Sequence, residues 1–300
     1  MKRLLLYGFL LSFCSFVNVY SQSAQNEYLG SVAKVHATID WRHFSVSIVL
    51  EGTLDRSEKN RLSQVSRQES DLRMLGTEYL TSALDSLLVD SRTTLQERFK
   101  KDSTIEESLK RDINGFKVVD AKPAASLQGT SVIWKLPFFP QLASLVGPIE
   151  SKGEKPSSPL GWKPDQVMSS IVIYADELLP WWGMNNNAWV AACLYPEVFD
   201  DEMNILHGTG TIDSQTEMEN GVVHYIADSD IKNMRNVLGN SAFFIRARSV
   251  FGKNPSSPVI SREDADIIRS STSGRQLLTE GKIFIVLSPA ELRKDYDLLP

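Results

Sequence analysis

Apolar and polar residues alternate in two successive runs near the start of the chain. Within Lys34–Trp41 (KVHATIDW) the odd-numbered positions are apolar, and within Phe44–Gly52 (FSVSIVLEG) the even-numbered positions are mostly apolar. Alternation with a period of two is typical of strands that bury one face. Because only Arg42 and His43 separate the two runs, we expect an antiparallel hairpin.

A helical pattern follows the two strands. Its apolar residues recur at spacings of three and four, which predicts one long amphipathic helix beginning before Leu62 and packed on a sheet. The apolar stripe consists of Leu72, Leu75, Tyr79, Leu80, Ala83, Leu84 and Leu87. Ser103 and Glu106 have the spacing of a capping box and Gly115 is a stop signal, so a second helix is expected over 104–113. Strands are predicted at Phe116–Ala121 and Ser131–Phe139.

The second half of the chain is richest in strand patterns. Strands are predicted at 169–176, 222–227, 242–250 and 282–288, with one short helix near 261–270. Strands and helices do not alternate regularly along the chain. We therefore expect an α+β fold with antiparallel sheets, a long amphipathic helix packed on the N-terminal sheet, and a strand-rich C-terminal half.

Composition divides the chain into four predicted segments. Residues 147–165 carry four prolines and three glycines, which predicts a linker or long loop. It would separate an N-terminal α+β domain at 22–146, containing the hairpin, both helices and the following strands, from a β-rich C-terminal domain at 166–300. Residues 1–21 form the remaining segment.

The first 21 residues have the pattern of a secretory signal peptide. Lys2 and Arg3 precede an apolar run over 4–17, and a cleavage site is expected after Ser21. The alternative, a membrane anchor, is less favoured because the run is shorter than the ~20 residues that span a bilayer. Lipidation at Cys14 is also disfavoured, since Phe13 occupies the position of the expected small residue. These features predict an exported protein of the periplasm or cell envelope.

Charge and cysteine content narrow the possibilities further. A net charge of -5 and a pI near 5.5 provide no basic field for phosphates, so nucleic acid is not an expected partner. Cys193 would be the only cysteine after signal cleavage, so no internal disulfide is expected. Its apolar neighbours predict a buried thiol.

Three consecutive acidic residues, Asp200, Asp201 and Glu202, are the first candidate for chemistry. A calcium loop starting at Asp200 would need glycine at its sixth position and glutamate at its twelfth, where Ile205 and Thr211 stand. The pattern therefore favours the turn of a hairpin, with the acidic side chains facing water.

Other catalytic and metal-binding patterns are incomplete. The segment His207–Asp213 has two glycines of a dinucleotide fingerprint but lacks the third. The spacing S-x-x-K occurs at Ser31–Lys34 and Ser229–Lys232 without the motifs that accompany it in serine enzymes. His207 and His224 are isolated. We predict no catalytic residues, no metal and no cofactor, and hence a protein that is not an enzyme.

A segment rich in tryptophan and asparagine, Leu178–Ala192 (LLPWWGMNNNAWVAA), is the one unusual feature. Exposed tryptophan can stack on sugars or anchor a protein interface. The alternative is a loop whose indoles fold back onto the core, and the sequence favours this alternative. The candidate binding residues are Trp181, Trp182, Asn185 and Trp189.

An ordered series of short motifs runs through the C-terminal half. It consists of Ile173–Asp176, Tyr195–Glu202, Gly221–Tyr225, Ile245–Ala247 and Val259–Asp266. This series resembles the LPP-twenty lipoprotein family together with the flagellar ring proteins FlgP and FlgT, and the resemblance extends over residues 57–287. The chain departs from the family pattern at the strands near 34–51, at 147–165, in the tryptophan-rich segment, and at Asn204, where the family turn has glycine.

The resemblance implies a structural or assembly component of a periplasmic machine, associated with the flagellum. The expected partners are envelope or flagellar basal-body proteins, with self-assembly possible and no transmembrane segment after signal cleavage. The alternative is a periplasmic module that binds glycan or protein through the tryptophan-rich segment.

Overall fold

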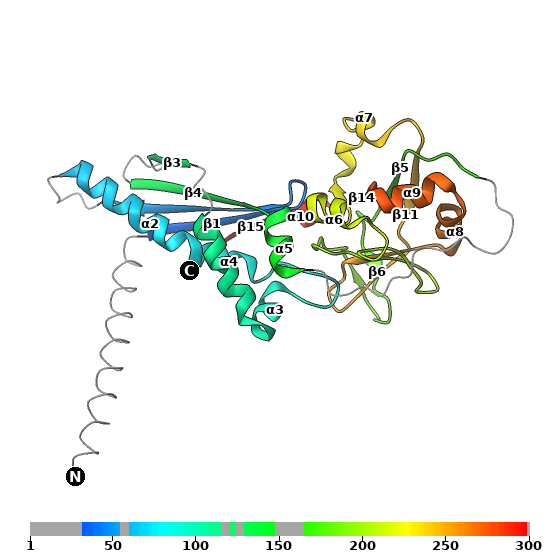
Figure 1. The fold of residues 1–300 in the computed structure, drawn as a ribbon, viewed down its shortest axis with the longest axis horizontal. Helices are drawn as coiled ribbons and strands as arrows, with labels where there is room; N and C mark the ends of the chain where they lie inside the picture. Colours follow the sequence, from blue (N-terminus) through cyan, green and yellow to red (C-terminus); the bar gives the residue numbers. More distant parts are fainter. Residues whose placement is uncertain (1–31, 55–59, 116–119, 124–128, 148–164, 299–300) are drawn as a thin grey trace, which may run out of the picture.

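The computed structural model describes residues 32–54, 60–115, 120–123, 129–147 and 165–298. The predicted signal peptide and residues 148–164 of the predicted linker lie outside the described residues. Figure 1 shows an elongated molecule in which a long sheet with its helices forms one end and the strand-rich half forms the other. The predicted α+β class is confirmed.

The N-terminal end is built on one antiparallel sheet. Its strand order is β15-β1-β2-β4-β3. The strands are β1 (Val32–Asp40), β2 (Ser45–Thr53), β3 (Asp120–Pro123), β4 (Gly129–Pro137) and β15 (Arg293–Asp297). The predicted hairpin is confirmed, since β1 pairs antiparallel with β2 from Asp40–Ser45 outward. The edge strand β15 comes from the end of the chain, and no local pattern predicted it.

Helices cover one face of this sheet. The long helix α2 (Arg61–Leu84) buries the predicted apolar stripe, including Leu72, Leu80 and Leu84. Gln68 fastens it, because its amide donates to Thr53 O at 2.7 Å and accepts from Thr130 N at 3.0 Å. The predicted second helix is confirmed as α4 (Ser103–Gly115). A short helix that was not predicted, α3 (Leu95–Lys101), precedes it and begins at a capping box formed by Thr94 and Glu97.

Gly76 lets α2 approach the sheet closely. A Cβ atom at this position would lie 2.1 Å from Nε1 of Trp134 on β4, and the Trp134 indole is itself buried. We expect Gly76→Ala to destabilise the protein by about 1–3 kcal/mol through overpacking. In an unpacked helix the same change would stabilise by up to about 1 kcal/mol, so the sign of the effect reports on the contact.

Urea unfolding measures this effect, and Ser70→Ala at an exposed position of the same helix is the control. The control is expected to change the unfolding free energy by less than about 0.5 kcal/mol. An increase in stability for Gly76→Ala would contradict the close approach of helix and sheet.

The main sheet of the C-terminal half is parallel, although antiparallel pairing was expected. Its order is β10-β14-β5-β11. The strands are β5 (Ser170–Tyr174), β10 (His224–Ile226), β11 (Ala242–Arg246) and β14 (Ile283–Val286). After β11 the chain makes a long excursion through two further strands and the helices α8 (Arg262–Ser270) and α9 (Thr272–Glu280). This excursion returns it beside β5 in the same direction, as parallel pairing requires.

A smaller sheet lies beside the parallel one. It has the order β12-β13-β8-β9, formed by β12 (Ser249–Phe251), β13 (Ser257–Ile260), β8 (Val198–Asp200) and β9 (Ile205–His207). The single strand predicted over 242–250 is therefore wrong, because the chain leaves β11 at Ala247 and enters β12 in a different sheet. The hairpin predicted around the three acidic residues is confirmed by the antiparallel pairing of β8 with β9.

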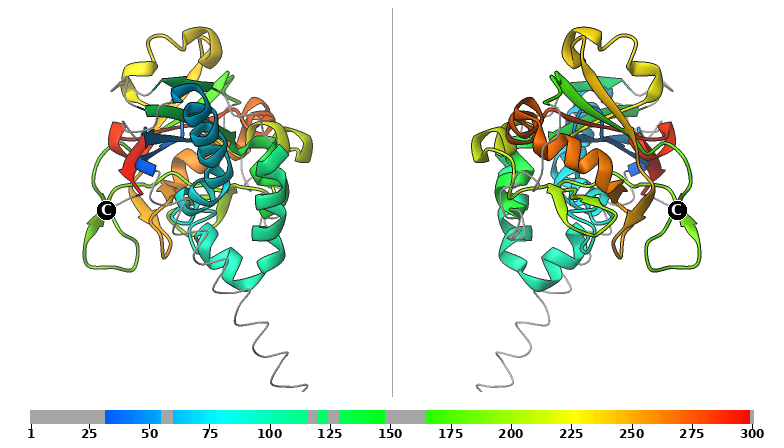
Figure 2. Two further views of the ribbon diagram at one scale, coloured as in Figure 1. Left: turned by 90° about the vertical axis from the view of Figure 1, so that its left-hand side faces the viewer. Right: turned by 90° about the vertical axis from the view of Figure 1, so that its right-hand side faces the viewer.

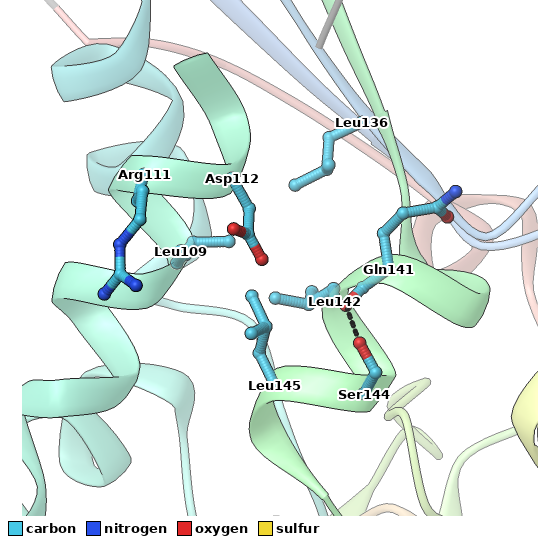
Figure 3. Close-up of a pocket in the computed structure, with 8 residues that line it drawn as sticks. All are labelled: Leu109, Arg111, Asp112, Leu136, Gln141, Leu142, Ser144 and Leu145. Atoms are coloured by element: carbon cyan, nitrogen blue, oxygen red, sulfur yellow. Dashed lines mark hydrogen bonds between the residues drawn. The ribbon is translucent and has the colours of Figure 1, made fainter. Parts of the chain in front are cut away.

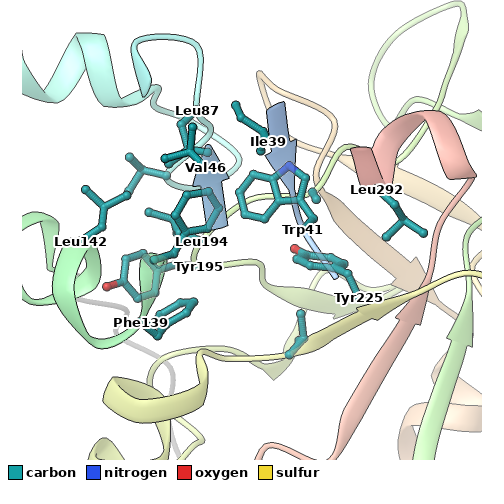
Figure 4. Close-up of a cluster of buried hydrophobic side chains, with 14 of the residues drawn as sticks. Ile39, Trp41, Val46, Leu87, Phe139, Leu142, Leu194, Tyr195, Tyr225 and Leu292 are labelled. Atoms are coloured by element: carbon teal, nitrogen blue, oxygen red, sulfur yellow. The ribbon is translucent and has the colours of Figure 1, made fainter. Parts of the chain in front are cut away.

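One continuous core joins the two ends of the molecule. Figure 4 shows Trp41, which follows β1, between side chains of both halves. Its indole makes edge contacts with Phe138 at 5.3 Å and with Tyr225 of β10 at 5.8 Å between ring centroids. The Trp41 amide also donates to Leu292 O at 2.9 Å. Residues on both sides of the predicted linker thus share one buried apolar cluster.

Candidate binding hairpin

The segment rich in tryptophan and asparagine folds as a short hairpin. Strand β6 (Leu179–Pro180) pairs antiparallel with β7 (Asn187–Ala188). Backbone bonds close the turn, since Trp181 N donates to Asn186 O at 3.0 Å and Met184 N donates to Trp181 O at 2.9 Å. Figure 2 shows this green hairpin standing out from one side of the molecule. We call residues 178–189 the tryptophan hairpin.

The base of the tryptophan hairpin is fixed to the body. The indole Nε1 of Trp181 donates to Gly252 O at 2.8 Å, and Trp182 N donates to Val250 O at 2.8 Å. Leu179 is buried on the same side. The Trp181 side chain is therefore half-buried and serves as the anchor. For this residue, the alternative prediction that the indoles fold back onto the core agrees with the structure.

The other candidate binding residues face solvent. Trp182 is 40% exposed and Trp189 is 41% exposed, and Asn185 is also exposed. Two neighbours that the sequence did not single out complete the patch, namely Met184 at 58% and Leu178 at 52%. The absence of any charged residue from Leu178 to Pro196 could have indicated them. Large apolar side chains concentrated in one exposed segment typically mark an interaction site.

The pairing register explains this division of the side chains. Because Leu179 lies across from Ala188 and Pro180 from Asn187, the same register places Leu178 across from Trp189. Side chains of directly paired residues lie on the same face of a hairpin. Leu178 and Trp189 thus share the outward face, while Leu179 and Ala188 share the inward one.

The three acidic residues of the β8–β9 turn are structural, and one of them is buried. Asp200 is fully buried, although it was expected to face water. Its carboxylate accepts from Arg269 of α8 at 2.8 Å and from the backbone and amide nitrogens of Asn204. Burial alone would raise the pKa of the Asp200 carboxyl, but these hydrogen bonds outweigh it and lower the pKa. The turn is thereby fastened to α8.

Two other titratable groups of the C-terminal half have strongly shifted pKa values. Burial lowers the pKa of His207 to about 4. Its Nε2 is hydrogen-bonded to Val222 O at 2.8 Å, and its Nδ1 is hydrogen-bonded to Thr211 Oγ1 at 2.9 Å. Burial raises the pKa of Glu217 to about 7. The ring nitrogens of His207 are thus both occupied by internal hydrogen bonds, which is typical of a structural histidine. The described residues contain no group of three or more His, Cys, Asp or Glu arranged to hold a metal ion.

Cys193 is buried, as predicted. Burial raises the pKa of its thiol to about 12, which keeps the thiol protonated and unreactive. The neighbouring Tyr225 hydroxyl accepts from Cys193 N at 3.1 Å and donates to Cys193 O at 3.0 Å.

A cavity of about 380 Å³ lies at the N-terminal end, between α4, β4 and α5 (Ala143–Val146). Figure 3 shows leucines around it, with the Asp112 carboxylate turned toward them and Arg111 turned away. The residues that line it are Leu109, Arg111, Asp112, Leu136, Gln141, Leu142, Ser144 and Leu145. Ser144 Oγ donates to Gln141 O at 2.7 Å, so its hydroxyl proton is held by the helix backbone.

These features define an α+β protein with a protruding, apolar-tipped hairpin. Residues 170–289 match the family model described as Treponema pallidum Tp0624, second domain. The chain is thus similar to that domain from β5 to the start of α10 (Pro289–Leu292), a region that includes the tryptophan hairpin. No curated protein matches the chain. The description of the matched family names neither the LPP-twenty lipoproteins nor FlgP or FlgT, so the resemblance of the sequence to those proteins stays a prediction.

The described residues include no helix with the length and apolar character needed to cross a membrane.

Proposed function

We propose that this protein is an exported, non-enzymatic envelope component that acts in the structure or assembly of a periplasmic machine, and that the tryptophan hairpin attaches it there. The observation that carries the proposal is the exposure of Trp182, Met184 and Trp189 on a hairpin whose base is fixed by the Trp181 indole. A fixed backbone lowers the entropy lost on binding, and tryptophan offers a large contact area with few rotamers. Both properties suit a docking element.

The identity of the periplasmic machine is a more specific part of the proposal. The ordered motifs of the C-terminal half resemble those of flagellar ring proteins, which favours the flagellar basal body. The second candidate function is a periplasmic glycan-binding module. It is favoured by the exposed amides of Asn185, Asn186 and Asn187 beside the two exposed indoles, since amides can bond hydroxyls while indoles stack on sugar rings.

Crosslinking in intact cells, followed by purification of the protein and mass spectrometry, tests the proposal. Wild type is expected to recover flagellar basal-body proteins, and a Trp182→Ala/Trp189→Ala variant is expected to lose most of them. Trp181 is kept in this variant so that the hairpin remains anchored. A Met218→Ala/Val237→Ala variant, which removes exposed apolar side chains elsewhere, is the matched control.

Each outcome decides one part of the proposal. If other envelope proteins are recovered and their recovery depends on Trp182 and Trp189, the flagellar assignment is wrong and the assembly role stands. Recovery of peptidoglycan in place of proteins would favour the glycan-binding module. Equal recovery by wild type and the tryptophan variant would overturn the role of the hairpin.

A further inference from the structure

The outward surface of the tryptophan hairpin combines exposed apolar side chains with a lack of charge. Leu178, Trp182, Met184 and Trp189 make up four of the ten large apolar side chains exposed among the described residues. Glu177 and Glu197 are the first charged residues on either side of the hairpin, although charged residues make up 23% of the whole chain. Residues 190–196 of this charge-free stretch are mostly buried, so its exposed part is residues 178–189, where large apolar side chains without charge typically mark an interaction surface.

Backbone hydrogen bonds hold the base of the tryptophan hairpin. The β6–β7 pairing and the bonds from Trp181 N to Asn186 O and from Met184 N to Trp181 O use part of its donors and acceptors internally. The bond from Trp182 N to Val250 O uses another donor at the base. The remaining polar groups of the turn are left to bond water or lipid headgroups, so this arrangement suits the hydrated edge of a bilayer and not its hydrocarbon core.

From these observations we infer that the outward face of the tryptophan hairpin inserts into the lipid–water interface of a bilayer. This inference rests on the proposed function, because it names the bilayer as the surface through which the same hairpin holds the protein at the periplasmic machine. Tryptophan prefers the headgroup level of membranes, where the ring lies among apolar groups and its N–H can be hydrogen-bonded. The amides of Asn185, Asn186 and Asn187 at the turn suit the same hydrated level.

The charge distribution favours a lipid surface over a protein one. Protein interfaces enriched in tryptophan are also enriched in arginine and have a polar rim. At the base of the hairpin, Arg246 is paired with Glu177 at 3.3 Å, so this arginine is already matched within the chain. A net charge of -5 gives the protein no general attraction to anionic lipids. The inserted hairpin should therefore bind zwitterionic bilayers as well as anionic ones, with little dependence on salt.

Flotation of the purified protein with phosphatidylcholine vesicles tests the inference. We expect wild type to float with the vesicles at low and high salt, and brominated lipids to quench its tryptophan fluorescence. A Trp182→Ala/Met184→Ser/Trp189→Ala variant should bind about tenfold more weakly. Met218→Ser/Val237→Thr, which changes exposed apolar residues outside the hairpin, should bind like wild type. Circular dichroism and urea unfolding confirm that the variants remain folded.

Several results would overturn the inference. These results are failure of wild type to float, equal flotation of the hairpin variant, and binding that requires anionic lipid and is lost at high salt. Failure here is separable from failure of the proposed function. If vesicles are not bound while crosslinking in cells still depends on Trp182 and Trp189, the hairpin binds a protein or glycan and the proposed function stands.

Discussion

Replacing Arg269 with methionine is expected to lower the free energy of unfolding by about 3–5 kcal/mol at neutral pH. The reason is the carboxylate of Asp200, which is fully buried and has Arg269 as its cationic partner at 2.8 Å. Methionine fills a similar volume but leaves the charge uncompensated. Urea unfolding at pH 7 measures the loss.

Arg262→Met is the matched control on the same helix. Its partner Glu202 is half-exposed, and solvent screens such a pair. The control should change stability by no more than about 1 kcal/mol. Similar losses for the two variants would show that the Asp200–Arg269 pair is no more important than a surface pair.

The same pair predicts a dependence on pH. The folded-state pKa of Asp200 is lowered from its ordinary value of 3.8, so the unfolded chain binds the proton more tightly. The stability contributed by this group is therefore fully present above about pH 4 to 5 and is lost as pH falls through the folded-state pKa. In Arg269→Met the pKa of Asp200 should rise above its ordinary value, so the variant should lose stability as pH rises from acid to neutral.

Trp41→Ala is expected to cost about 3–5 kcal/mol and to affect both ends of the molecule together. The indole lies between Phe138, which follows β4, and Tyr225 of β10, and its side chain is only 2% exposed. Truncation would leave a cavity where the two halves share their core. Urea unfolding followed by circular dichroism and by fluorescence measures the loss of stability and the coincidence of the two transitions.

Trp189→Ala provides the control, because the same chemical change at a 41% exposed position should cost less than about 1 kcal/mol. Separate transitions for the two ends in Trp41→Ala would contradict the expectation that both ends lose stability together. A loss below about 1 kcal/mol would contradict the central position of this side chain in the core.

Local periodicity was sufficient for much of the N-terminal end. The β1–β2 hairpin, the apolar stripe of α2 and the extent of α4 follow from residues that are near neighbours in sequence. The short helix α3 was missed, although the capping box of Thr94 and Glu97 is readable in the sequence. The edge strand β15 could not be predicted in the same way. It has a charged, mostly exposed sequence, and its place is decided by pairing with β1 and by the bond from the Tyr296 hydroxyl to Ala83 O.

Strand direction in the C-terminal half was decided by long-range packing. Apolar strands carry the same local pattern in parallel and antiparallel sheets when both faces are covered. The pattern could locate β5, β10 and β14, but it could not say that α8 and α9 return the chain beside β5 in parallel.

For the candidate site, the sequence by itself determined which segment is unusual and which residue types it offers. Only the tertiary structure decided their roles, because hydrogen bonds to distant residues select one indole as anchor. Trp181 reaches Gly252 O, whereas Trp182 and Trp189 are exposed to solvent, and the hairpin register places Trp189 on the outward face. Asp200 likewise differs from its acidic neighbours only because Arg269 approaches it from α8. Composition and spacing identify the side chains, and the folded chain alone brings each one to its partner or to solvent.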